Sequence, residues 1–563
     1  MDLRPPRWTL LLLPVLAVGM LVLGHALGPS SSTETRYCEM GREMAVSGDL
    51  VLPTFNGAPL LEKPPLVYWA TSTAFRLFGI DDVVARIPQL LAAALVLLVT
   101  AWVARRLAPE GPGGRWRGAL AALALGTMPS FLVQAYAISP DIWLLLSTTL
   151  AGAALLEADR APGRAPRRWA LLLHGGMGLG MLAKGPLTLA LALGAAVATA
   201  AIRRRARILK PFVDPLGLLL FAAITVPWYL ALDARLPGML RSLVERRLFG
   251  TLAAASDFHR HAPWVVWLPL LGTLPWAGML PGAIRQIASR ERWRDGIGLP
   301  IVALALAAPI LFTFSTARLP SDASPAYPWL ALLVALGAPA LGAGDAVPGA
   351  RLARRELGRA ALGTGLFAGA LGLAALAAAA GLGPVRVAWP YAAGIAAAGL
   401  LACAMTWLPR PSAGLARPVP RAAVSITLLL LAGGCLAADR PTRVGAAGEL
   451  CTALASHRVP GEPVAVSLNY NGDWGLVPWC TRGEVPFIGY PSAPMMVAPE
   501  ISRPDLFLPA AEREPWLRGP GRRWMMLRPR DLRKLADAGV PLTTVATVHE
   551  YVLVATKPLD GPR

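Results

Sequence analysis

The sequence is poor in charged residues. Only 16% of its 563 residues are Asp, Glu, Lys or Arg, whereas soluble domains carry about 25%. Apolar residues make up 55% of the chain, which excludes a purely soluble protein. One helical crossing of a bilayer needs roughly 20 apolar residues. Apolar stretches of about this length fill most of the first 438 positions.

Cysteine is scarce as well. The five cysteines have no Cys-X-X-Cys spacing, which argues against a structural zinc site. Cys451 and Cys480 both lie in the C-terminal segment. If that segment lies outside the cytoplasm, the pair suits a disulfide, and two buried free thiols are the equally weighted alternative.

Acidic residues are outnumbered, 34 against 54 basic ones, which gives a net charge of +20. The basic residues cluster in short loops between apolar stretches and form no basic aromatic face, so we expect no nucleic-acid partner. Cytoplasmic loops of membrane proteins collect Lys and Arg, and about half of the basic residues fall in seven such loops, at 4–7, 105–117, 160–168, 203–210, 285–294, 351–359 and 410–421.

The apolar segments predict about thirteen transmembrane helices. Loops 160–168 and 203–210 are both basic, so the chain between them must cross twice, with a turn near Lys184 and Pro186. The same parity predicts a turn at Ser139 and Pro140, a cytoplasmic N-terminus and a periplasmic C-terminal domain in a Gram-negative inner membrane. The expected crossings are 8–28, 83–104, 118–137, 141–158, 169–183, 187–202, 211–232, 262–284, 298–316, 326–343, 359–382, 387–409 and 422–438.

The last part of the chain has a different pattern. Residues 462–470 and 543–557 have β-like alternation, and 528–539 have a helical pattern. We therefore expect a transmembrane domain at 1–438 and a small soluble α/β domain at 439–563.

Two long outer loops are expected at 29–82 and 233–261, and long connections are often functional. Residues 32–45 look helical, with a Ser or Thr cap and an acidic first turn. Residues 64–79 open with proline and carry spaced apolar side chains, which predicts a helix lying in the membrane interface.

The first loop resembles a known family. It reads "TETRYCEMGREMAVSGDLVLPTFNGAPLLEKPPLVYW", which is similar to the first periplasmic loop of the lipid A 4-amino-4-deoxy-L-arabinose transferases. These enzymes fall within the polyprenyl-phosphate-sugar glycosyltransferases that include protein O-mannosyltransferases. Further motifs follow in the family order, among them "ISPDIWLL", "LAKGPLTLAL" and "VPWYLAL".

The resemblance implies a polytopic α-helical fold of GT-C type and transfer of a sugar from undecaprenyl phosphate. The acceptor would be lipid A, another glycan or a protein, and membrane lipids would surround the site. Transfer would invert C1, with the carrier phosphate as leaving group. No nucleotide cofactor or metal site is expected, and a divalent cation bound by Glu34 and Asp141 is the alternative.

The resemblance also implies cations for the donor phosphate. Lys63 in "EKPP" is the first candidate, against the alternative of an ordinary snorkelling lysine. Arg36, Arg246 and Arg247 are further candidates for the donor phosphate or for an anionic acceptor, with Arg247 favoured over Arg246 by its distance from the next Phe. Lys184 either binds an anion or caps a helix C-terminus.

Glu34 and Asp141 are the expected catalytic carboxylates. Asp141 begins a crossing, where a helix N-terminus also favours a carboxylate for structural reasons. Thr33 stands where the family has Asp directly before Glu34. Either Glu34 takes over the role, or the acceptor is already ionised and needs no base, or the protein is inactive.

A second departure lies near residue 320. Arg318 and Asp322 stand where the family commonly has Lys and Tyr, so the sugar is left open. His259 and His261 supply too few ligands for a metal. The alternative functions are transfer of another sugar to protein or lipopolysaccharide core, a noncatalytic paralogue, and a lipid or sugar transporter, against which the lack of an internal repeat argues.

Overall fold

The computed structural model describes part of the chain. The described residues are 32–107, 113–161, 166–244, 262–273, 280–287, 296–315, 319–337, 443–467, 476–489, 503–548 and 551–557, with a few isolated positions. The expected crossings at 8–28, 359–382, 387–409 and 422–438 lie outside them.

The chain divides into two compact units. The first contains Met1–Leu21 and Gln89–Asp439, and the second contains Val22–Pro88 and Arg440–Arg563. The first outer loop, which the sequence assigned to the transmembrane domain, therefore groups with the C-terminal segment. The expected domain boundary at residue 438 stays a prediction.

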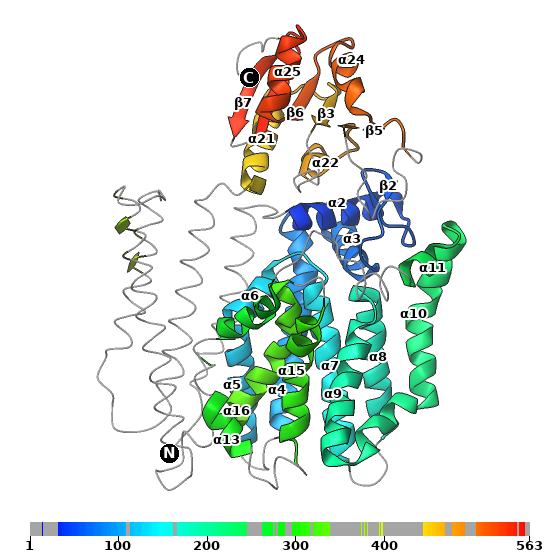
Figure 1. Cartoon of the computed structure of the whole chain (residues 1–563), viewed down its shortest axis with the longest axis vertical. Helices are drawn as coiled ribbons and strands as arrows, with labels where there is room; N and C mark the ends of the chain where they lie inside the picture. Colours follow the sequence, from blue (N-terminus) through cyan, green and yellow to red (C-terminus); the bar gives the residue numbers. More distant parts are fainter. Residues whose placement is uncertain are drawn as a thin grey trace. The chain divides into compact units, whose positions relative to one another are not determined.

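The first unit is a helical bundle (Figure 1). Most of its described helices lie close to expected crossings, because these apolar segments are bounded by prolines, glycines or basic residues. In chain order they are α4 (Ile87–Leu107), α5 (Gly113–Gly126), α6 (Pro129–Tyr136), α7 (Asp141–Arg160), α8 (Arg167–Lys184), α9 (Leu187–Arg203), η3 (Ala206–Val213), α10 (Pro215–Arg235), α11 (Met239–Val244), η6 (Pro263–Thr273), α13 (Leu280–Ile287), α15 (Gly298–Thr313), η8 (Pro320–Ala326) and α16 (Tyr327–Gly337).

Several of these helices suit a bilayer. Within the described residues, three are long and apolar enough to cross a membrane: Val84–Leu107, Asp141–Arg160 and Pro215–Arg235. Arg117–Gly126 and Pro129–Tyr136 form a fourth crossing if the pair, bent by 68°, counts as one. Pro129 begins the second half of the pair, and its missing N–H interrupts the helical hydrogen bonds there. The total of thirteen crossings stays a prediction.

Both expected turns are confirmed. Gly185 ends α8 with a φ of 79°, a left-handed conformation that suits glycine. The chain then reverses into α9. Ser139 and Pro140 separate α6 from α7.

The segment expected to cross at 262–284 differs. Its described residues form a 3₁₀ helix, Pro263–Thr273, and a short α-helix, Leu280–Ile287. Prolines recur every six residues, at 263, 269, 275 and 281. Each removes a backbone donor, so one continuous α-helix is disfavoured.

Close backbone approaches pack the bundle. A Cβ atom on Gly152 of α7 would lie 2.3 Å from the Trp329 ring of α16, so only glycine fits there. Trp329 is itself 2% exposed and belongs to a core that includes Leu145 and Ile301.

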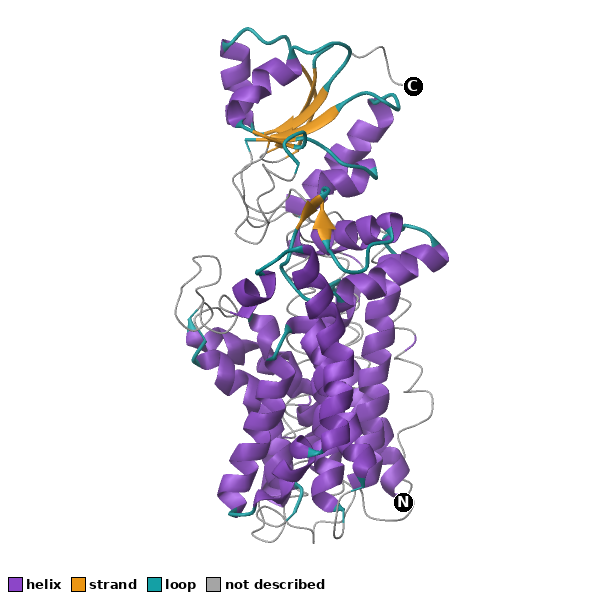
Figure 2. Ribbon diagram, turned by 90° about the vertical axis from the view of Figure 1, so that its right-hand side faces the viewer, coloured by secondary structure: helices purple, strands orange, loops and turns teal. Residues whose placement is uncertain are grey.

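The second unit combines helices with a mixed sheet (Figure 2). Its first-loop elements are α2 (Ser32–Ser47), β1 (Thr54–Phe55), β2 (Ala58–Pro59), α3 (Leu66–Phe78) and η2 (Val84–Arg86). Its C-terminal elements are α21 (Arg443–His457), β3 (Val464–Ser467), α22 (Leu476–Thr481), β4 (Phe487–Ile488), β5 (Phe507–Leu508), η9 (Ala510–Glu512), α24 (Arg513–Leu517), β6 (Trp524–Leu527), α25 (Pro529–Asp537), β7 (Thr543–Val548) and β8 (Tyr551–Ala555).

The sheet has six strands in the order β5-β4-β3-β6-β8-β7. Strands β5, β4, β3 and β6 are parallel neighbours, and β8 pairs antiparallel with β6 and β7. The strands and the helix expected in the C-terminal segment are therefore present. Strands β3, β6 and β8 are buried along their whole length, as is typical of strands covered on both faces.

Helices α2 and α3 pack closely. A Cβ atom on Gly41 would lie 2.8 Å from the Thr71 side chain, so the two backbones approach at this glycine. Arg76 of α3 donates hydrogen bonds to the carbonyls of Met44 and Ala45 at the end of α2, which satisfies terminal acceptors of that helix.

The second unit contains a disulfide between Cys451 and Cys480, whose Cα atoms are 6.0 Å apart. The sequence left open a disulfide or two buried free thiols, and the structure contains the disulfide. The disulfide joins α21 to α22 across 29 positions of the chain.

Candidate functional site

Three expected site residues meet in the helical unit. Lys184 ends α8, Asp141 begins α7 and Asp322 lies in η8. The Lys184 Nζ atom is 2.6 Å from Asp141 Oδ1 and 3.1 Å from Asp322 Oδ1. Helix ends from three separate segments thus bring one ammonium between two carboxylates.

The cluster of Asp141, Lys184 and Asp322 carries one positive and two negative charges. The three side chains are between 7% and 14% exposed, so their charges interact more strongly than on an open surface. The ammonium of Lys184 offsets the carboxylates, and one negative charge remains. Such a cluster favours hydroxyl or cationic groups of a ligand over a phosphate, and the expected anion-binding role of Lys184 stays a prediction.

The two carboxylates of this cluster differ in their surroundings. The second oxygen of Asp322, Oδ2, accepts a hydrogen bond from the Leu319 N–H at 2.8 Å. Asp322 therefore also fixes the start of η8. The Asp141 side chain is the more exposed of the two, at 14% against 7%. Asp141 is thus better placed than Asp322 to touch a ligand.

A second group of expected residues lies in the first-loop part of the other unit. Arg36 Nε is 3.0 Å from Glu62 Oε2, and the Tyr37 hydroxyl donates to Glu62 Oε1 at 3.3 Å. Lys63 follows Glu62 directly and is half-buried in the bend before α3. Glu62 thus holds Arg36 close to the backbone segment that carries Lys63.

Glu34 points into the protein interior. It lies in the first turn of α2, is 3% exposed, and forms an ion pair with Arg86 at 3.6 Å. Arg86 is 1% exposed and donates from Nη1 to the Asp82 carbonyl at 2.8 Å. This environment suits a residue that anchors α2, and catalysis by Glu34 stays a prediction.

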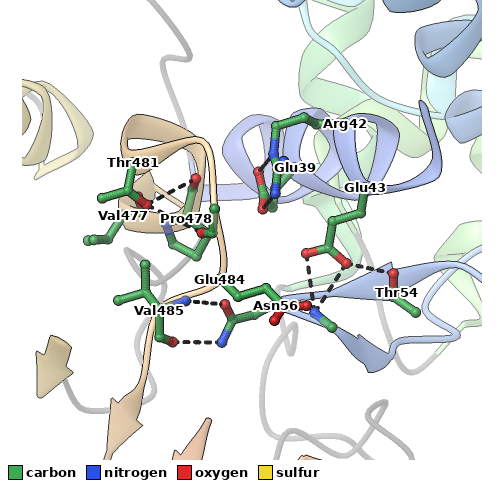
Figure 3. A network of polar contacts seen from close by, with 12 residues as sticks. Glu39, Arg42, Glu43, Thr54, Asn56, Val477, Pro478, Thr481, Glu484 and Val485 are labelled. Carbon is green, nitrogen blue, oxygen red and sulfur yellow. Dashed lines mark hydrogen bonds and ion pairs between the residues drawn. The ribbon is translucent and has the colours of Figure 1, made fainter. Parts of the chain in front are cut away.

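A third polar network joins α2 to the β1–β2 hairpin (Figure 3). Glu39 accepts two hydrogen bonds from Arg42, at 2.6 and 2.8 Å. Glu43 accepts from the Thr54 hydroxyl at 2.6 Å and from the Gly57 N–H at 3.2 Å. Burial raises the pKa of Glu43 to about 7, and the nearby Glu39 carboxylate adds to the rise.

Neither Glu62 nor Arg86 was predicted as a site residue. The sequence could have indicated Glu62 as a site residue, because it stands beside Lys63 in the "EKPP" motif. The sequence could also have indicated that Arg86 is paired, because burying a lone arginine charge at the start of an apolar crossing costs free energy unless it has a partner. Its partner Glu34 lies 52 positions earlier, and no local pattern reveals such a pair.

Arg246, Arg247 and Arg318, together with His259 and His261, lie outside the described residues. Among the residues that are described, no group of three or more His, Cys, Asp or Glu side chains is arranged to hold a metal ion. A divalent cation at Glu34 and Asp141 stays a prediction, because the two residues belong to different units.

Comparison with known proteins bears on the same residues. Residues 30–241 match the family model described as Dolichyl-phosphate-mannose-protein mannosyltransferase. This range includes Arg36, Lys63, Asp141 and Lys184.

Relatives with assigned activities are similar over part of the chain. An undecaprenyl phosphate-alpha-4-amino-4-deoxy-L-arabinose arabinosyl transferase of Edwardsiella ictaluri is 33% identical over 307 residues, 54% of each chain. A protein of the same name from Pseudomonas aeruginosa is 32% identical over 348 residues, 59% of each chain. The chain thus matches little more than half the length of these relatives.

Solved structures are similar over nearly the whole chain. ArnT from Cupriavidus metallidurans, bound to undecaprenyl phosphate, superposes with a TM-score of 0.79 at 23% identity and covers 99% of both chains. The same protein in the apo state gives 0.76 at 24% identity, with 98% of both chains covered. The chain is therefore a polytopic helical membrane protein with the ArnT-like GT-C fold.

Proposed function

We propose that this protein is a glycosyltransferase that moves a sugar from undecaprenyl phosphate to an acceptor at the periplasmic face of the inner membrane. Lipid A is the favoured acceptor and an aminoarabinose the favoured sugar. One observation carries the proposal: the residues that match the mannosyltransferase family model also contain the polar clusters around Arg36 and Lys184.

The donor side needs cations close to the membrane. A polyprenyl-phosphate sugar has an apolar chain and an anionic head, and charged side chains at membrane depth are usually functional. Lys63 and Arg36 would contact the phosphate. Arg36 is held by Glu62, so its guanidinium is fixed before the donor arrives.

The chemical step is a displacement at C1 of the sugar. An acceptor oxygen forms the new bond to C1 while the bond from C1 to the carrier phosphate oxygen breaks, with inversion. The electron pair stays on the phosphate, and Lys63 and Arg36 stabilise its charge. No redox partner is needed.

The described residues of the first loop offer no evident general base to deprotonate an acceptor. Thr33 cannot act as a base, and Glu34 is paired with Arg86. A phosphate acceptor is already ionised and needs no deprotonation, whereas a hydroxyl acceptor gains from a base by about 10²- to 10⁴-fold. This balance supports lipid A phosphate over a protein hydroxyl. Asp141 is the carboxylate left to orient the sugar.

The disulfide supports the proposed orientation. Disulfides persist in oxidising compartments such as the periplasm and are rare in the cytosol. Cys451 and Cys480 are bonded in the C-terminal segment, so we assign that segment to the periplasm. The parity of the basic loops then assigns the N-terminus to the cytoplasm.

Lipid A mass spectrometry tests the proposal in cells with and without the gene. An added pentosamine that depends on the gene is the expected result, and unchanged lipid A would exclude this acceptor. In the purified enzyme, Lys63→Ala should abolish transfer. Lys210→Ala is the matched control, because Lys210 is an exposed lysine in a loop expected to be cytoplasmic. Full activity of Lys63→Ala would refute the phosphate role.

A further inference from the structure

We infer that Trp479 is a positioning residue for the donor-phosphate cations of the first loop. It would act through Asp82, Arg86 and Glu34. The inference rests on the proposed function, because it takes Arg36 and Lys63 as the groups that meet the carrier phosphate. All of these residues belong to the second unit.

Trp479 lies in α22 and is 3% exposed. Its ring centroid is 5.7 Å from that of Phe75 in α3, and the Arg482 guanidinium lies 4.0 Å from the ring centroid. These contacts fix the indole plane. Its Nε1–H then donates to Asp82 Oδ1 at 2.9 Å.

Asp82 connects the indole to a buried arginine. Its carboxylate accepts from Trp479, and its backbone carbonyl accepts from Arg86 Nη1 at 2.8 Å. Both ends of Asp82 are therefore held. A hydrogen bond to a charged group contributes more to stability than a hydrogen bond between neutral groups, so loss of the indole N–H should loosen this segment.

Arg86 continues the connection to α2. Its Nη2 atom is 3.6 Å from Glu34 Oε2. Glu34 lies two residues before Arg36, which is paired with Glu62 beside Lys63. The first turn of α2 is thus held on one side by Arg86 and on another by Glu62. A shift of Arg86 would move the turn that presents Arg36.

The disulfide reinforces Trp479 from the other side. Cys480 is the next residue, and its bond to Cys451 ties α22 to α21. Helix α22 has only six residues, and isolated helices that short are unstable in water. The covalent tie therefore helps to keep the indole against Asp82.

A purely structural role for Trp479 is the competing explanation, and a second tryptophan separates the two. Trp524 in β6 is also buried, and its Nε1–H donates to Glu462 Oε2 at 2.6 Å. It has the same type of bond, but both partners lie in the C-terminal part of the unit. Replacing either tryptophan with Phe removes the N–H and keeps an aromatic ring.

The test compares Trp479→Phe with Trp524→Phe in the full-length protein. Undecaprenyl phosphate binding, donor KM, kcat and Tm are measured for each. We expect Trp479→Phe to weaken undecaprenyl phosphate binding and raise donor KM by about fivefold, with kcat within about twofold of wild type. Trp524→Phe should lower Tm and leave both donor values unchanged. Unchanged donor values in Trp479→Phe, or equal changes in both variants, would overturn the inference.

Asp82 gives a second route if Trp479→Phe does not fold. Asp82→Asn keeps an oxygen that accepts from the indole, whereas Asp82→Ala removes it. We expect Asp82→Ala to weaken undecaprenyl phosphate binding and Asp82→Asn to restore most of it; equal binding by the two variants would overturn the inference. Wild-type protein that does not bind undecaprenyl phosphate at all would instead refute the proposed function.

Discussion

The side-chain amide of Asn56 forms two hydrogen bonds of 2.8 Å with the backbone of Val485, 429 positions further along the chain. Asn56 donates to the Val485 carbonyl and accepts from its N–H. The residue is fully buried and has a φ of 51° at the tip of the β1–β2 hairpin. One amide thereby attaches the hairpin to the C-terminal segment within the second unit (Figure 3).

Replacing this amide should destabilise the second unit. Asn56→Ala leaves the Val485 N–H and carbonyl buried without Asn56, and Ala tolerates the positive φ less well, so we expect a loss of about 2–4 kcal/mol. Asn56→Asp keeps the acceptor and the tolerance for this φ, so it should lose less. Thermal unfolding of the purified protein, followed by tryptophan fluorescence, measures both; equal Tm values for the two variants would contradict this reading.

The stability of the second unit should depend on pH through Glu43. Its pKa is raised to about 7 from an ordinary value of 4.5, so the folded state binds the proton more tightly than the unfolded state. The stabilisation is therefore fully present below about pH 4.5 and is lost as the pH rises to about 7, by up to roughly 3 kcal/mol.

Glu43→Gln should flatten that pH dependence, because the amide keeps an acceptor for Gly57 and a partner for Thr54 without a titrating proton. The measurement is Tm between pH 5 and pH 8. Glu484→Gln is the control, since its carboxylate is more exposed and pairs with Arg503. A wild-type Tm that rises across this range would contradict the assignment.

Removing the ammonium of Lys184 should be costly. Lys184→Met leaves the buried Asp322 carboxylate and the largely buried Asp141 carboxylate without their shared cation, which we expect to destabilise the helical unit by about 3–5 kcal/mol. Lys184→Met/Asp322→Asn removes one of the repelling charges and should regain part of the loss. Thermal unfolding in detergent measures the Tm of both variants. A double variant no more stable than the single one would count against the charge argument.

Asp141 should matter for transfer more than for folding. Asp141→Asn keeps the shape and a hydrogen-bonding oxygen for Lys184, so we expect a small change in Tm. Loss of the charge that orients the sugar should lower transfer by about 10²-fold. Asp322→Asn should cost less activity, because Asp322 also caps η8. Single-turnover transfer rates, set beside Tm, separate the two effects, and equal rates for both variants would argue against Asp141 as the ligand-facing carboxylate.

The disulfide should stabilise the second unit measurably. It closes a loop of 29 positions, for which chain entropy gives about 3–4 kcal/mol. A reducing agent should therefore lower Tm in the wild type. It should have no effect on Cys451→Ser/Cys480→Ser, which serves as the control, and a shift of similar size in that variant would point to another cause.

Much of the helical unit could be predicted from the sequence, because local signals determine it. The turn at Lys184 and Pro186 follows from two basic loops and a Gly-Pro pair, and α7 and α10 follow from apolar length. The prolines between 263 and 281 were equally visible, yet overall apolarity suggested one helix. Apolar composition indicates that a segment is buried in protein or lipid, whereas the spacing of its prolines decides whether helical backbone hydrogen bonds can continue through it.

The polar clusters were predicted only in part. Lys184, Asp141 and Asp322 were each expected as site residues, but their meeting depends on where three helix ends fall in space. Arg86 with Glu34, and Asn56 with Val485, could not be paired, because a single sequence carries no signal for partners 52 or 429 positions apart.

The second unit is built from two segments far apart in the sequence, which affects the order in which it can assemble during synthesis. Residues 22–88 group with residues 440–563 in one compact unit, so the early segment cannot form these contacts until the later segment has been synthesised. At about 5–20 residues per second, that delay is roughly half a minute or longer. During it, Asn56 at the tip of the β1–β2 hairpin has not yet met Val485, its backbone partner in the finished unit.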